Sequence, residues 1–197
     1  LASILPAPSG SVVAKVVQQR LRQQVVERVD ALARAAAEPS ARTALIEPLL
    51  HSLKAAKEGG VADEPLRAAL ARLPADRVRQ LGQTAHAQFP MLAGAFPPAY
   101  RTALAASLKD KVDAYVASSG DASAEPLAAL VAVLKEAQWA GVRTEQIRRE
   151  ITRLPEVHRQ ALDQVAAERA PELASVLAAP ATVRPWLPQQ VAIYRQL

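Results

Sequence analysis

The strongest constraint on the fold is an internal repeat with a spacing of 81 residues. Gly60-Val61 recurs as Gly141-Val142, and Arg72-Leu73-Pro74 recurs as Arg153-Leu154-Pro155. Further pairs are Glu64 with Glu145, Arg67 with Arg148, Leu81 with Leu162, Pro90 with Pro171 and Leu92 with Leu173. A fixed period indicates a tandem array of one structural unit. We therefore expect two copies of a unit of about 80 residues.

The apolar residues indicate helices. Val17, Leu21, Val25 and Val29 lie four residues apart, the spacing of one face of an amphipathic helix. The same pattern recurs from Leu104 to Tyr115. No segment alternates between β-branched and polar residues as a strand would. The expected fold is all-α, with four helices in each unit, arranged as paired helical bundles or as a short α-solenoid.

Prolines, glycines and capping residues set the predicted boundaries. The first unit should hold helices over residues 11–37, 40–57, 63–73 and 75–88, and the second over 99–118, 122–139, 144–154 and 156–169. Asp63 and Thr144 are the predicted N-caps of the third helices. Gly59-Gly60 should close the second helix as a C-cap. We expect a linker at 1–10, unit 1 at 11–96, unit 2 at 97–179 and a C-terminal packing tail at 180–197, anchored by Trp186, Leu187 and Tyr194.

The charge and hydropathy of the chain limit the classes of partner that we expect. The net charge is +5, with 18 Arg and 6 Lys, but the acids are interleaved with the bases. Specific nucleic-acid binders concentrate their positive charge, so we do not expect one here. No apolar run is long enough for a transmembrane segment. The Ala- and Arg-rich composition and the non-Met start favour a fragment of a larger bacterial protein, secreted effectors being one such group, in the cytoplasm or a host cell.

No motif predicts catalysis. There is no Cys, which removes thiolate zinc sites and Cys nucleophiles. His51, His86 and His158 are not repeated, and His51 and His86 have no partner at metal-ligand spacing. Glycine-rich phosphate loops are absent. We expect no enzyme, no cofactor and no metal site; an enzyme would need a cleft beside these histidines or the acids.

The repeated arginines are the candidate site. They are either a solvated face with intrahelical Glu–Arg pairs, or two equivalent basic patches that grip an acidic partner through bidentate hydrogen bonds. Trp139 is unmatched in the first unit, and core anchoring and a binding hot spot are both open for it. The candidate partner-binding residues are Arg67, Arg72, Arg148, Arg149, Arg153 and Trp139.

The sequence thus favours a non-enzymatic helical module that binds a protein with an acidic surface. The alternative is a basic membrane-targeting module that reads anionic lipid head groups. The first helix carries five bases, but its apolar stripe of Val and Ala lacks the Trp or Phe anchors expected at a membrane interface.

Overall fold

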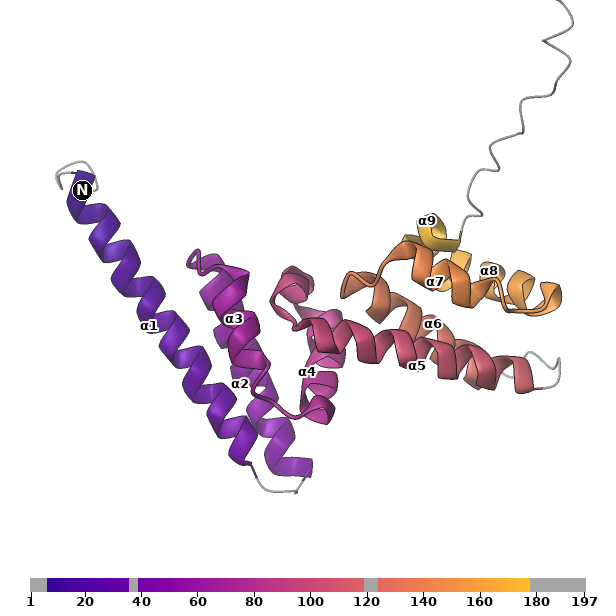
Figure 1. Ribbon diagram of the computed structural model, residues 1–197, viewed down its shortest axis with the longest axis horizontal. Coiled ribbons are helices and arrows are strands. Elements are labelled where there is room, and N and C mark those ends of the chain that lie inside the picture. Colours follow the sequence, from indigo (N-terminus) through magenta and orange to yellow (C-terminus); the bar gives the residue numbers. More distant parts are fainter. Residues whose placement is uncertain (1–6, 36–38, 119–123, 178–197) are drawn as a thin grey trace, which may run out of the picture.

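The computed structural model describes residues 7–35, 39–118 and 124–177, and over these the protein is all-α (Figure 1). The described chain forms nine α-helices and two 3-10 helices, without a strand. The predicted anchoring by Trp186, Leu187 and Tyr194 lies outside these residues.

The elements follow one another in two similar series. The first is α1 (Ala7–Arg34), α2 (Pro39–Glu58), α3 (Asp63–Leu70), α4 (Ala75–Gln88) and the 3-10 helix η1 (Pro90–Ala95). The second is α5 (Pro98–Ala117), α6 (Ala124–Trp139), α7 (Thr144–Ile151), α8 (Glu156–Arg169), the 3-10 helix η2 (Pro171–Leu173) and α9 (Ala174–Leu177). The predicted bounds of α4 and α8 are confirmed, whereas α1 begins and ends earlier than predicted.

Each series is built on a pair of neighbouring long helices. α1 packs against α2, and α5 packs against α6 (Figure 1). Val25 and Val29 of α1 and Leu108 of α5 are fully buried, as the predicted apolar register requires, but Val17 on the same register is 47 % exposed. The short helices α3 and α7 then cover α1 and α5 respectively. A continuous apolar core runs through both series.

Two glycines close α2 and α6 in the left-handed conformation. The φ angles of Gly60 and Gly141 are 78° and 77°, a region that L side chains avoid. The amide of Val61 donates to the carbonyl of Ala56 at 2.9 Å, which is the long bond of a Schellman C-cap. The predicted C-cap is therefore confirmed at Gly60.

The predicted side-chain N-caps are wrong. α3 and α7 are preceded by Ala62 and Arg143, and no side chain caps either helix. Asp63 is already inside the first turn, and its carboxylate pairs with Lys57 at 2.5 Å instead. A carboxylate at this place still lies at the positive end of the helix dipole, so the preference for an acid remains.

The two series meet at η1, α4, α5 and α6 (Figure 1). Phe96 and Tyr100 are buried in this joint, and Tyr100 fills space that a side chain at position 82 would occupy, so Gly82 allows the close approach. Met91, between Pro90 and the buried Leu92, is 46 % exposed. With three residues per turn in a 3-10 helix, Leu92 faces inward and its neighbour Met91 faces outward.

Candidate functional site

Two of the candidate arginines tie the third helix of each series to the segment that follows the fourth helix. Arg67 donates from Nη2 to the carbonyl of Gly94 at 3.1 Å. Arg148 donates from Nη2 to the carbonyl of Ser175 at 2.7 Å and from Nε to that of Val176 at 3.1 Å. Gly94 and Ser175 are also 81 residues apart. These guanidinium groups are thus engaged in equivalent internal hydrogen bonds.

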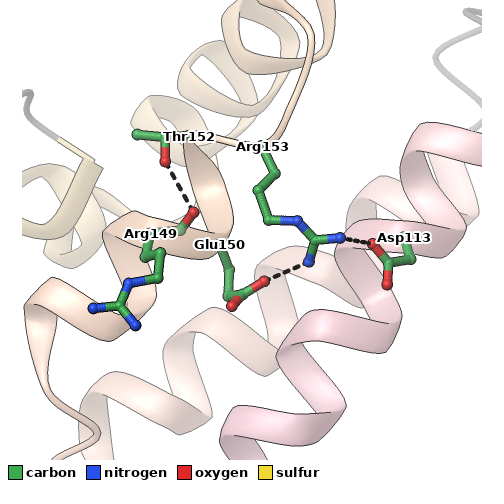
Figure 2. Close-up of polar contacts among 5 residues, drawn as sticks. All are labelled: Asp113, Arg149, Glu150, Thr152 and Arg153. Carbon is green, nitrogen blue, oxygen red and sulfur yellow. Dashed lines mark hydrogen bonds and ion pairs between the residues drawn. The ribbon is translucent and has the colours of Figure 1, made fainter.

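The other repeated pair ties the end of the third helix to the first helix of its series. Arg72 lies 3.8 Å from the carboxylate of Asp30. Arg153 lies 2.6 Å from Asp113 and 2.6 Å from Glu150 (Figure 2). The hydrogen bond to Glu150, with Asp113 adding to it, raises the pKa of Arg153. The Arg153 interaction is shorter and involves two carboxylates, so it is stronger than the ion pair of Arg72 with Asp30.

Arg149 differs from the repeated arginines. Its side chain points away from the Glu150–Arg153–Asp113 chain (Figure 2), and it makes no ion pair within the described residues. Ala68 occupies its place in the first series. Among the five candidate arginines, Arg149 is therefore the one whose guanidinium stays available to a partner.

Trp139 lies in the joint between the two series. Its Nε1 donates to the carbonyl of Pro90 at 3.0 Å. Its ring meets the ring of Phe96 edge-on at 5.2 Å and that of His86 at 5.9 Å. Burial lowers the pKa of His86, and Glu136 partly offsets this effect. The geometry supports core anchoring by Trp139, and its partly exposed edge lines a small cavity of about 320 Å³.

The sequence analysis missed a buried polar pair in the same joint. Glu136 is the one buried charged residue in the described part of the chain, and the Tyr100 hydroxyl donates to its carboxylate. Burial, followed by this hydrogen bond, raises the pKa of Tyr100. No sequence signal indicated this pair, because at about 100° per residue Glu136 points away from the buried face of Leu127, Leu130 and Leu134 on α6.

Within the described residues, the histidines belong to no group of three or more His, Cys, Asp or Glu side chains that could hold a metal ion. Each ring packs edge-on against an aromatic ring instead: His51 on Phe89 at 5.4 Å and His158 on Tyr115 at 4.8 Å. His86 packs on Trp139 in the same way.

A groove recurs at the same place in both series, between the first helix and the turn that leads into the third helix. The first groove has a volume of about 390 Å³ and the second about 620 Å³. The cations lining the first groove are Lys15 and Arg22. Those lining the second groove are Arg101, Lys109 and Arg143.

The start of α1 presents an exposed apolar face, which we call the valine stripe. It consists of Val12, Val13, Val16 and Val17, which are 47–60 % exposed. This end of α1 projects beyond α2 and α3 (Figure 1). The bases of the projecting end are Lys15, Arg20 and Arg22, and the first acid of the helix is Glu27.

Comparisons with known proteins give no relative: no family model, curated protein or solved structure matches the chain. A search of the described residues found no helix with the length and hydropathy needed to cross a bilayer.

Proposed function

We propose that the chain is a tandem duplication of a four-helix unit and acts as a non-enzymatic protein-interaction module. Three observations support the duplication. α3 and α7 both have 8 residues, and α4 and α8 both have 14. Gly60 and Gly141 share a positive φ. The arginine contacts to the following segment and to the first helix also recur.

The observation that carries the interaction function is the register of the valine stripe. Position 17 corresponds to Tyr100, 83 residues later. Both lie in the first long helix of their series, but Tyr100 is buried against Gly82 of the preceding unit, whereas Val17 and Val13, one turn before it, are exposed. This part of the first long helix is therefore buried against the neighbouring unit in the second copy and exposed in the first copy. Exposed apolar patches of this kind mark interaction sites.

The opposite end of the chain is different in chemistry. Val78 and Gly82, which receive the start of α5, correspond to Arg159 and Asp163 in the second unit. Terminal units of repeat proteins have polar outer faces of this kind. The second unit thus resembles a capped end, and the first unit resembles an open one.

The partner that fits the valine stripe is another helical surface with small residues, because Tyr100 packs in the same way against Gly82 of α4. Its rim should be acidic, because Lys15, Arg20 and Arg22 flank the stripe without a nearby acid. The Ala- and Arg-rich composition is compatible with a module of a larger bacterial protein, for example a secreted effector.

A capture experiment tests this proposal. The double variant Val13→Asp/Val17→Asp should lose a partner that the native chain retains from an extract of the source cell. Val116→Asp/Val157→Asp is the matched control, because both valines are exposed and lie elsewhere. The control should keep the partner. Equal capture by the native chain and the stripe variant would show that the stripe is not the interaction surface.

The second candidate function, binding to anionic lipid head groups, is favoured by the combination of exposed valines and three bases on one projecting helix end. Flotation with phosphatidylserine vesicles separates the two functions. Lipid binding should rise with phosphatidylserine content and fall with salt. If the native chain stays unbound at low salt, this second candidate is removed.

A further inference from the structure

The second groove gathers cations from separate elements. Arg101 and Lys109 come from α5, and Arg143 comes from the turn before α7. The acid that lines the groove is Glu150, and its carboxylate already pairs with Arg153 at 2.6 Å. The groove therefore has an excess of positive charge.

The groove is long and has a floor of small residues. Arg101 and Lys109 are eight residues apart on α5, so their Cα atoms are about 12 Å apart. Ala105 and Ala106 lie between them. A Cβ placed on Gly141 would meet no atom within 4 Å, so space remains open above the turn. An extended peptide rises about 3.3 Å per residue, so roughly four of its residues match the distance between the two cations.

Two features at one end of the groove favour a carboxylate. Arg101 makes no hydrogen bond or ion pair within the described residues, so the terminal nitrogens of its guanidinium are free to donate two hydrogen bonds to a carboxylate. No side chain caps the start of α7 at Arg143, and its dipole adds a partial positive charge there.

The two grooves differ at two lining positions that carry cations only in the second groove. Gln18 and Ala62 stand where the second unit has Arg101 and Arg143. The amide of Gln18 donates to the carbonyl of Gly60 at 3.2 Å and so closes part of the first groove. The copies thus share the groove, but the second is larger and has cations at both of these places.

We propose that the second groove binds an extended acidic peptide segment, with one carboxylate on Arg101 and Arg143 and a second on Lys109. The cations are spread along the groove, which fits separated carboxylates better than one compact anion. This inference adds a second binding surface to the proposed interaction module and does not depend on the valine stripe.

Fluorescence anisotropy of a fluorescein-labelled peptide of alternating glutamate and alanine, added to the full chain at low salt, tests the proposal. The variant Arg101→Gln/Arg143→Ala should bind the peptide about tenfold more weakly or worse, since two charge-assisted donors are lost. These replacements give the second groove the residues of the first, so the fold should be kept. In NMR spectra, the peptide should shift the amide signal of Gly141.

The matched control is Arg28→Gln/Arg169→Gln, which removes two exposed charges outside both grooves. It should bind the peptide within about twofold of the native chain. Equal losses in both variants would mean non-specific charge attraction and would overturn the proposal. Binding of phosphatidylserine vesicles or inorganic phosphate through Arg101 and Arg143, without binding of the peptide, would also overturn it. Because the probe is defined, failure here leaves the capture test of the valine stripe unaffected.

Discussion

The two proposed units make the same internal arginine contacts but differ at their surfaces. In both, an arginine of the third helix binds a carbonyl that follows the fourth helix, as Arg67 and Arg148 do. In both, a second arginine meets an aspartate of the first helix, as Arg72 and Arg153 do. The repeated arginines therefore make contacts within their own unit.

The differences lie where each unit faces something else. Tyr100 of the second unit is buried in the joint, whereas its counterpart Val17 is exposed. Gly82 admits Tyr100, whereas Asp163 at the same place in the second unit is exposed. Two of the four predictions below compare matched positions of the proposed units, and the other two compare residues within the second unit.

The largest difference is expected between positions 82 and 163. Gly82→Leu would force Tyr100 out of the joint, and overpacking together with the lost hydrogen bond to Glu136 should cost about 3 kcal/mol or more of unfolding free energy. Asp163→Leu should change it by less than about 0.5 kcal/mol, since the side chain is exposed. Urea unfolding measures both. Similar losses of unfolding free energy at the two positions would contradict the packing of Tyr100 against Gly82.

The next largest difference is expected between two buried tyrosines. Tyr100→Phe leaves the buried Glu136 carboxylate without its donor and should cost about 2 kcal/mol. Tyr115→Phe removes only a long contact, 3.4 Å, to the carbonyl of His158, and should cost under about 1 kcal/mol. Thermal and urea unfolding of the two variants give the comparison. A larger loss for Tyr115→Phe would contradict it.

A smaller effect separates two adjacent arginines. Arg148→Ala removes two hydrogen bonds to backbone carbonyls and should destabilise the protein by about 1 kcal/mol. Arg149→Ala should be neutral within about 0.5 kcal/mol, because its side chain is exposed. If Arg149→Ala instead weakens capture of a partner while the fold is kept, Arg149 belongs to a binding surface. Equal destabilisation by both variants would contradict the internal role of Arg148.

Much of the fold could be predicted because helix formation follows local chemistry. The four-residue spacing of Val25 and Val29 identified a buried face, Gly60 marked the end of α2 and Pro74 the start of α4. The predicted end of the third helix at residue 73 was wrong, because α3 ends at Leu70. The N-cap prediction at Asp63 failed because a tertiary partner, Lys57, binds the carboxylate. Local rules do not include such partners.

The site was harder to predict because a repeated arginine has the same sequence pattern whether its guanidinium faces a partner or a carbonyl of its own chain. Only the packing of η1 and α9 brings Gly94 and Ser175 within reach of Arg67 and Arg148. Likewise, the pairing of Tyr100 with Glu136 joins residues 36 positions apart across two helices. Spacing along the sequence does not fix contacts of this kind.

The smallest predicted effect concerns His86, whose place in the second unit is taken by Ala167. Burial lowers the pKa of His86 from 6.5, and Lys135 acts in the same direction, while Glu136 and Glu172 oppose it. In the unfolded chain this histidine therefore binds its proton at a higher pH than in the folded chain. By linkage, its contribution to stability is present above pH 6.5 and is lost as the pH falls through the folded pKa.

An NMR titration of the His86 ring proton should therefore give a midpoint below 6.5. The variant His86→Gln identifies the signal and should remove this part of the pH dependence of unfolding, which we expect to be under about 1 kcal/mol because the ring is only partly buried. His86→Ala, which introduces the residue of the second unit, should behave in the same way. A midpoint above 6.5 would mean that Glu136 and Glu172 outweigh burial, and that the joint binds His86 in its charged form.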